Sequence, residues 1–370
     1  MTDTSIPLEP SGFDAELMQR LIRCKYPEVV VESVRIVDAA LSSEGESRVS
    51  TARRIAVEVG YGSGGPADLP TRLIVKVARP GLGDIPLYDN EVNVYARVGD
   101  ELPVTTPRCL GAYRDAPSSS FGLVLEDLRP RDALFPSVLT PTTVDDVRGV
   151  IDQLADLHAA YWQSERFDND LSWVHPHISG PIHELFNHEG GVPMLINWEV
   201  QTQQFKRELV ESVSETPDSL LEKVARAQQH QASLPQTLVH GDTHVGNTYR
   251  LADGSCGLLD WQLSARGFGM HDVTYIIITG LSVTDRRRHE HDLIAHYHRR
   301  LSEAGLSDVP PLDDLLQEYR YAAAWCFYIG WLTTPLENYG WEINVANHIR
   351  LATAYRDLES KQALEALQAG

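Results

Sequence analysis

Short apolar runs separated by polar or Gly/Pro-rich stretches dominate the first part of the chain. A short amphipathic helix precedes them, since Leu17, Leu21 and Ile22 share one face between Asp14 and Cys24. The runs then follow at 29–37, 55–59, 73–78, 109–113 and 121–128. Runs of this length that are rich in β-branched residues are typical of strands, so the pattern predicts a β-rich first part.

Beyond residue 140 the apolar spacing becomes that of helices. Val150, Leu154 and Leu157 recur every three or four residues, and His158 lies on the same stripe. We expect His158 to be a hydrogen-bonded core residue rather than a catalyst. Further helices are expected over 199–212, 217–231, 272–278, 294–301, 312–332 and 345–367. This part of the chain is therefore predicted to be mainly helical.

Two short apolar runs in the middle of the chain each lead to an acidic residue. The run 237–239 precedes Asp242, and the run 257–259 ends at Asp260. Asp253-Gly254 lies between the runs and is a strong turn signal, so the segment is predicted to form a hairpin or a near-hairpin. Such a hairpin would bring Asp242, Asn247 and Asp260 to one end of a short sheet.

These three side chains suit phosphoryl transfer. Asp242 is a carboxylate that can receive a proton from an attacking hydroxyl, and we take it as the candidate base. Asn247 and Asp260 supply oxygens for a hard cation, which makes them candidate Mg²⁺ ligands.

The same segment resembles the aminoglycoside phosphotransferase and choline kinase superfamily of small-molecule kinases. Residues 240–247 read HGDTHVGN and follow the pattern H-G-D-x-H-x-x-N, and the Asp-Trp-Gln at 260–262 is most similar to the ecdysteroid-kinase-like and related bacterial branch. The resemblance implies an α+β, protein-kinase-like fold of two lobes. The N-terminal nucleotide-binding lobe, 1–128, would hold an antiparallel sheet, and the larger, mainly helical lobe, 129–370, would bind the substrate and catalyse transfer. ATP and Mg²⁺ would be the cofactors.

Lys76 lies in a predicted strand with apolar residues on both sides, and a buried ammonium needs an anionic partner. Glu91 and Asp89 are the acidic candidates in the following helix, and residues two apart do not share a helix face. We choose Glu91, which has the longer reach. In the family such a pair touches the α/β phosphates, so both residues are candidate nucleotide-site residues.

Three further roles depend on the resemblance. Backbone groups from Glu126 to Leu128 would bond the adenine edge. The loop from Ser42 to Arg54, which includes Ser47, would cover the phosphates, although its only glycine is Gly45 and an ordinary hairpin remains an equal alternative. Asp272 would brace the catalytic loop, or simply cap its helix.

The formal charge of −20 argues against nucleic acid or an anionic membrane as partners, because both require a basic face. The four cysteines are scattered, and the first ten residues lack the basic start and apolar stretch of a signal peptide. We therefore expect a cytoplasmic protein. The longest apolar run, 322–332, is too short to span a bilayer and predicts a buried helix.

Alternatives remain open. The protein could be a nucleotide-binding pseudokinase or binding protein without transfer activity, or HGDTH could hold zinc in a hydrolase. Its glycines and the absent glutamate disfavour the zinc site. The four histidines at 175, 177, 183 and 188 fit no metal-ligand spacing. The expected partner is a small hydroxylated acceptor, with aminoglycosides, steroid-like alcohols, choline-like amines and sugars all open.

Overall fold

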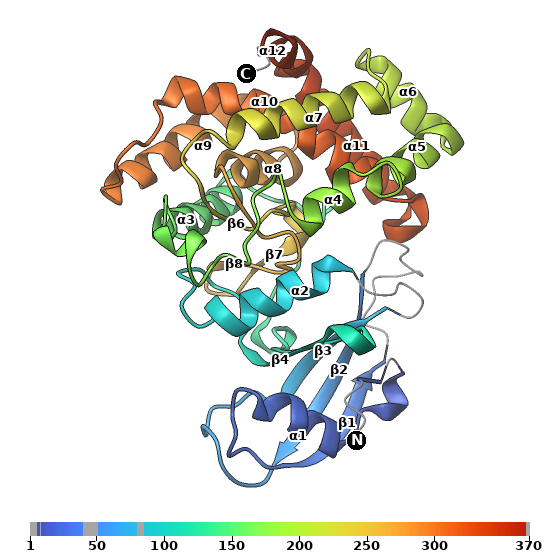
Figure 1. Ribbon diagram of the computed structural model, residues 1–370, viewed down its shortest axis with the longest axis vertical. Coiled ribbons are helices and arrows are strands. Elements are labelled where there is room, and N and C mark those ends of the chain that lie inside the picture. Colours follow the sequence, from blue (N-terminus) through green and yellow to red (C-terminus); the bar gives the residue numbers. More distant parts are fainter. Residues whose placement is uncertain (1–5, 8, 40–50, 80–84, 368–370) are drawn as a thin grey trace. The chain divides into compact units, whose positions relative to one another are not determined.

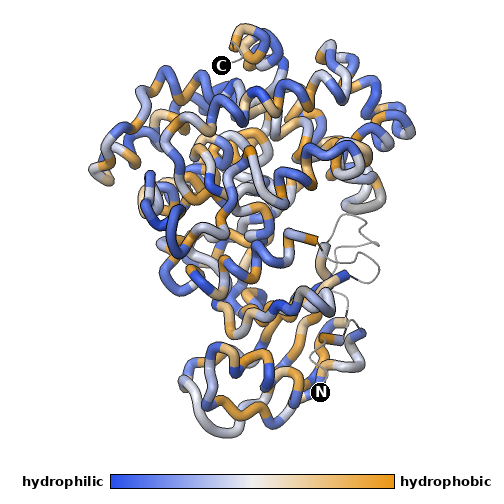
Figure 2. Tube along the Cα trace, viewed as in Figure 1, coloured by the Kyte–Doolittle hydropathy of each residue, from blue (hydrophilic) through white to orange (hydrophobic). Residues whose placement is uncertain are grey.

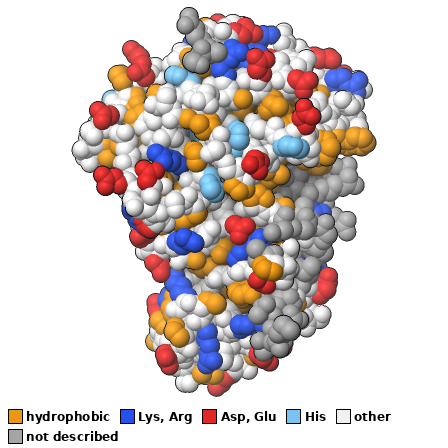
Figure 3. All heavy atoms as spheres, viewed as in Figure 1, with side chains coloured by type: hydrophobic (Ala, Val, Ile, Leu, Met, Phe, Trp, Pro, Cys, Tyr) orange, Lys and Arg blue, Asp and Glu red, His pale blue; other side chains and the backbone are white. Residues whose placement is uncertain are grey.

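The computed structural model describes residues 6–7, 9–39, 51–79 and 85–367 (Figure 1). The chain divides into two compact units. The first comprises Met1–Leu102 and Thr106–Leu134, and the second comprises Pro103–Thr105 and Phe135–Gly370. Acidic and basic side chains are interspersed on the face of each unit seen in Figure 3.

The first unit is built on a five-stranded antiparallel sheet of order β1-β2-β3-β5-β4. Its strands are hydrophobic along much of their length (Figure 2), and residues such as Val57, Val75 and Val124 are fully buried in the core. Two helices pack on the sheet. The elements are α1 (Ala15–Arg23), β1 (Val31–Asp38), β2 (Ala52–Tyr61), β3 (Arg72–Ala78), α2 (Pro86–Asn93), the short helix η2 (Val94–Val98), β4 (Cys109–Asp115) and β5 (Ser120–Glu126).

The second unit is mainly helical. Its first helix, α3 (Val144–Ala160), begins with a reciprocal capping box between Thr143 and Asp146. The other helices are α4 (Pro181–Asn187), α5 (Val192–Thr202), α6 (Gln204–Ser212), α7 (Pro217–Gln231), α8 (Met270–Gly280), α9 (Val283–Glu303), α10 (Leu312–Leu332), α11 (Leu336–Asp357) and α12 (Ser360–Ala366). The predicted α+β fold, with an antiparallel sheet in the N-terminal part and a mainly helical C-terminal part, is confirmed.

Two helical expectations have clear outcomes. The apolar run at 322–332 lies in α10 as a buried core helix, and none of the described helices is long and apolar enough to cross a membrane. The single terminal helix expected over 345–367 was wrong. The backbone turns left-handed at Glu359, with φ of 50°, and this residue separates α11 from α12.

The predicted hairpin forms between other strands than expected. Asp253-Gly254 joins β7 (Thr248–Arg250) to β8 (Cys256–Leu258). The run at 237–239 is β6 (Thr237–Val239), and it pairs antiparallel with β9 (Ala265–Gly267) instead of with β8. The prediction that the two apolar runs pair with each other was therefore wrong. The loop after β6 and the end of β8 are joined instead by the Leu259 N–H, which donates to Asn247 O at 2.8 Å.

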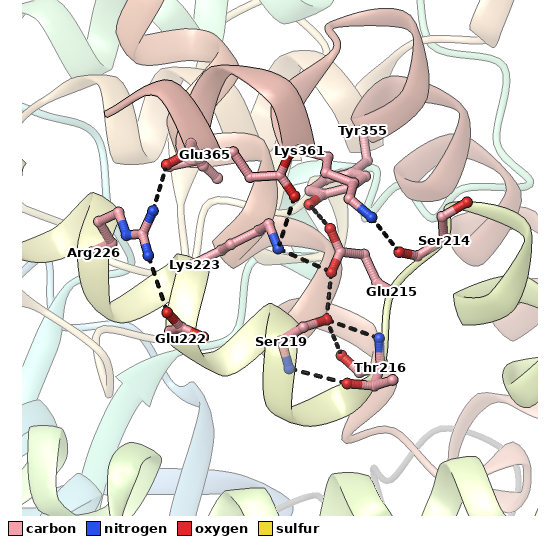
Figure 4. Close-up of polar contacts among 11 residues, drawn as sticks. Ser214, Glu215, Thr216, Ser219, Glu222, Lys223, Arg226, Tyr355, Lys361 and Glu365 are labelled. Carbon is pink, nitrogen blue, oxygen red and sulfur yellow. Dashed lines mark hydrogen bonds and ion pairs between the residues drawn. The ribbon is translucent and has the colours of Figure 1, made fainter. Parts of the chain in front are cut away.

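A buried carboxylate ties the end of the chain to α7 (Figure 4). Glu215 accepts from Tyr355 O–H at 2.9 Å and from Lys223 Nζ at 3.1 Å, and Ser219 O–H also donates to it. Tyr355 lies in α11, whereas Lys223 and Ser219 lie in α7. The Glu215 side chain is almost completely buried, so these donors replace the water it loses on folding.

Tyr355→Phe is expected to lower the free energy of unfolding by about 1.5–3 kcal/mol, because it removes a buried hydrogen bond to a charged group. Lys361→Ala, which removes a surface bond to Ser214 O, should change the stability by less than about 0.5 kcal/mol. Urea unfolding of both variants measures the difference. Equal losses in the two variants would show that the Glu215 contacts do not contribute.

Candidate active site

The loop that follows β6 is held from below by one carboxylate. Asp272 Oδ2 accepts from the His240 N–H at 2.7 Å, and Asp272 Oδ1 accepts from the Gly241 N–H at 2.9 Å. The Thr243 hydroxyl donates to Asp272 O at 2.7 Å. The bracing role expected for Asp272 is therefore confirmed, since its side chain fixes the backbone just before Asp242.

Asp272 is itself held by a buried histidine. His158 Nε2 lies 3.2 Å from Asp272 Oδ2, and His158 Nδ1 lies 2.8 Å from the Tyr297 hydroxyl. The expectation that His158 is a hydrogen-bonded core residue is confirmed. Tyr297 was missed by sequence reasoning, because the sequence does not indicate that α9 packs against α3, which carries His158.

The turn into the loop requires a glycine at position 241. Gly241 has φ of 85°, and a Cβ there would lie 1.9 Å from Leu263 O. The neighbouring His240 is fully buried, with its Nε2 2.9 Å from Leu259 O and its ring against Trp261 at 4.6 Å between centroids. These contacts join the loop to the segment that carries Asp260.

Hydrogen bonds join the candidate base, Asp242, to one candidate metal ligand, Asn247. Asn247 Nδ2 donates to both the carbonyl and the carboxylate of Asp242, each at 2.9 Å. This leaves the Asn247 amide oxygen as the group suited to a cation. Burial, followed by the nearby Asp260 charge, raises the pKa of Asp242 to about 8, and the bond from Asn247 opposes that shift.

Asp260 follows β8 and has a left-handed backbone, with φ of 64°. Among the described residues no group of three or more His, Cys, Asp or Glu side chains could hold a metal. The Asp260 carboxylate and the Asn247 amide oxygen, the two candidate ligands, are both hard oxygen donors. This set fits Mg²⁺, which keeps several waters and is held by one or two carboxylates together with substrate phosphates.

The zinc alternative has no support in the geometry. His240 faces Leu259 O, and His244 Nδ1 accepts from the Gly246 N–H at 3.1 Å, so each imidazole contacts backbone. Burial lowers the pKa of His244 to about 4 and keeps the ring neutral. His244 thus stabilises the turn that presents Asn247.

The first unit contains the predicted ion pair. Lys76 on β3 donates to both carboxylate oxygens of Glu91 on α2, at 2.6 and 2.8 Å. Both residues are buried: 4% of the surface of Lys76 is exposed, and 0% of that of Glu91. Asp89 instead forms a bidentate ion pair with Arg114, at 2.9 and 3.1 Å. The prediction that Lys76 contacts Glu91 rather than Asp89 is therefore confirmed.

Hydrogen bonds hold the strand end proposed for adenine. The Glu126 N–H donates to Arg108 O at 2.8 Å, and Leu128 O accepts from the Arg131 N–H at 2.9 Å. Between them, Asp127 accepts from the Arg129 backbone and guanidinium at 2.8–3.0 Å. Asp127 was not singled out by sequence reasoning, although an Asp two residues before an Arg is a local signal. Ser47 lies outside the described residues.

Replacing Asp272 by Asn should lower the free energy of unfolding at neutral pH by about 2 kcal/mol, because the carboxylate accepts two buried N–H groups. The other titratable groups that interact with it include His158, His177, His240, Asp242, His271, Tyr297 and Cys326. Although burial opposes it, the His158 bond lowers the pKa of Asp272 to about 2, below the ordinary 3.8.

The stability that this shift contributes is present above pH 4 and lost as the pH falls through 2. The gap between the wild-type protein and Asp272→Asn should therefore narrow by about 2 kcal/mol between pH 5 and pH 2. Denaturant titrations across that range measure it. If the difference in the free energy of unfolding did not change with pH, the Asp272 carboxylate would not support the loop in its ionised form.

A five-stranded antiparallel unit with a Lys–Glu pair, followed by a helical unit with an H-G-D-x-H-x-x-N loop, defines the class of protein-kinase-like phosphotransferases. Residues 44–308 match the model of the ecdysteroid kinase-like family, and the chain belongs to that family. The resemblance inferred from the central loop is confirmed. No curated protein matched the sequence.

Similar solved structures include three small-molecule kinases, and the first of them supports the fold. An ethanolamine kinase from Plasmodium vivax is similar over 85% of this chain and 83% of its own, with 14% identity and a TM-score of 0.52. A spectinomycin phosphotransferase matches with 11% identity over 96% and 98% of the two chains and a TM-score of 0.49. A choline kinase from Streptococcus pneumoniae matches with 13% identity over 88% and 94% and a TM-score of 0.43.

Proposed function

We propose that the protein transfers the γ-phosphoryl group of ATP to a hydroxyl of a small molecule. The observation that supports this most strongly is the direct bonding of Asn247 to Asp242, which combines a proton acceptor and a cation ligand in one short loop. Membership of a kinase-like family supports the same reaction.

Asp242 acts as the base. As the acceptor oxygen bonds to the γ-phosphorus, the bond from that phosphorus to the β,γ-bridging oxygen breaks and ADP leaves. Asp242 takes the proton released by the acceptor hydroxyl. Asn247 and Asp260 would hold Mg²⁺, which neutralises phosphate charge when bound and offsets the Asp260 charge that raises the pKa of Asp242.

Lys76 binds the α- and β-phosphates of the same ATP, and Glu91 holds its ammonium in place. A buried lysine that loses its partner is strongly disfavoured. Glu91 therefore keeps the Lys76 ammonium charged and in position before ATP binds. Backbone groups from Glu126 to Leu128 bind the adenine edge, and the loop containing Ser47 covers the phosphates. The nucleotide-binding lobe is then 1–128 and the catalytic and substrate-binding lobe 129–370.

The acceptor is a small hydroxylated molecule. Relatives in structure are named for ethanolamine, choline and spectinomycin, which sets the first compounds to test. Sterols and sugars complete the panel.

A coupled assay of ADP release tests the proposal. Purified protein with Mg-ATP is screened against the panel, and at least one alcohol should raise ADP release above the rate without acceptor, in a magnesium-dependent way. A protein that binds Mg-ATP yet phosphorylates no member of the panel would instead be a nucleotide-binding pseudokinase.

A further inference from the structure

The last turn of α8 lies behind the turn that presents Asn247. The Val245 N–H donates to Thr279 Oγ1 at 3.1 Å, and the Thr279 hydroxyl donates in turn to Tyr275 O at 2.7 Å. The His244 ring meets the Tyr275 ring edge-on, with centroids 5.9 Å apart. Two residues one helical turn apart on α8 therefore support the turn over 244–247.

The next two backbone N–H groups of this turn donate within it. The Gly246 N–H donates to His244 Nδ1 at 3.1 Å, and the Asn247 N–H donates to His244 O at 2.8 Å. The Val245 N–H is different, because its acceptor comes from another helix. Val245 is buried, so loss of that acceptor would leave its donor without water and displace the turn.

Arg350 on α11 holds the other side of Thr279. One guanidinium nitrogen donates to Thr279 O, and the other donates to Val138 O at 3.0 Å. The last carbonyls of a helix have no partner within it, and a cation there also complements the helix dipole. Arg350 thus fixes the end of α8, where the Thr279 hydroxyl must stay.

Arg350 has no carboxylate partner among the described residues, and burial lowers its pKa. Arg286, also shielded from solvent, is paired with both Glu290 and Asp357. The hydrogen bonds of Arg350 are directed at backbone carbonyls. Its contribution is therefore to hold two chain segments in place rather than to neutralise an acid.

We infer that Thr279 and Arg350 are positioning residues for the turn over 244–247, which presents the proposed magnesium ligand Asn247. Thr279 fixes Val245, two residues before Asn247, and Arg350 fixes Thr279. The inference rests on the proposed function, because Asn247 is a proposed magnesium ligand. Groups that orient metal ligands typically contribute 10–100-fold to metal affinity.

The test uses three threonine variants. Thr279→Val removes the hydroxyl but keeps the shape, and Thr279→Ser keeps the hydroxyl. Thr274→Val is the matched control, since Thr274 is on the same helix and its buried hydroxyl has no partner among the described residues. Calorimetry of a nonhydrolysable ATP analogue at increasing magnesium gives the magnesium concentration for half-maximal binding.

We expect Thr279→Val and Arg350→Met to raise that concentration by about 10-fold, while Thr279→Ser and Thr274→Val stay close to the wild type. A thermal melt checks that each variant is folded. If Arg350→Met does not fold, the comparison of Thr279→Val with Thr279→Ser tests the inference by itself. Thr279→Val within twofold of the wild type, or Thr274→Val equally impaired, would overturn the inference alone. A wild type without magnesium-dependent binding would overturn the proposed magnesium site as well.

Discussion

Asp242→Asn should lower acceptor-dependent ADP formation by a factor of about 10²–10⁴, the usual contribution of a positioned general base. The amide cannot take the proton from the acceptor hydroxyl. It can still accept from Asn247 Nδ2, which donates to the native carboxylate at 2.9 Å. The loop should therefore keep its shape, and binding of a nonhydrolysable ATP analogue should change little. Steady-state kinetics with the first acceptor found by the screen measure the loss.

Asp253→Asn is the matched control, because it makes the same chemical change at an exposed turn of the β7–β8 hairpin. Its turnover should equal that of the wild type. If Asp242→Asn retained more than a tenth of the wild-type turnover, Asp242 would not be the base.

Asp260→Asn should raise the magnesium concentration for half-maximal activity by at least about 10-fold and lower saturated turnover by about 10²-fold. The variant loses the only carboxylate proposed to bind the cation. A bound cation stabilises the charge of the transition state by several kcal/mol. Asn tolerates the left-handed backbone at this position, where φ is 64°. The variant therefore removes charge without straining the chain.

Asp308→Asn tests that reasoning separately. Asp308 is an exposed residue in the same backbone conformation, with φ of 60°. It should leave both stability and magnesium dependence unchanged. Unchanged magnesium dependence in Asp260→Asn itself would remove Asp260 from the cation site.

Contacts that follow from local rules were predictable from the sequence. Helix geometry excluded either Asp89 or Glu91 as the partner of Lys76, and the structure pairs Lys76 with Glu91. The sequence pattern predicted that Asp242, Asn247 and Asp260 lie together, and of these three the structure shows a hydrogen bond from the Asn247 amide to Asp242. The residue types themselves carried this information.

Contacts that depend on strand pairing across sequence were not predictable. β7 reads Thr-Tyr-Arg and is too short to show an alternating pattern, so the turn at 253–254 was connected to the wrong strand. β6 finds its partner beyond Asp260, in β9. The register of such short strands is set by packing around them rather than by their own residues.

The supports behind the loop were equally hidden. Tyr297 and Thr279 reach the site only because α8 and α9 pack against neighbouring segments, and no spacing rule indicates which distant residue a helix side chain will meet. The break between α11 and α12 at Glu359 has no Gly or Pro to signal it.

The most direct test is an experimental structure with magnesium and a nonhydrolysable ATP analogue. The proposed function predicts that the Lys76 ammonium contacts α- or β-phosphate oxygens of the analogue. On the same triphosphate, the Asp260 carboxylate and the Asn247 amide oxygen should ligate the cation. A triphosphate that contacts neither Lys76 nor the cation at Asp260 would contradict the phosphotransfer function.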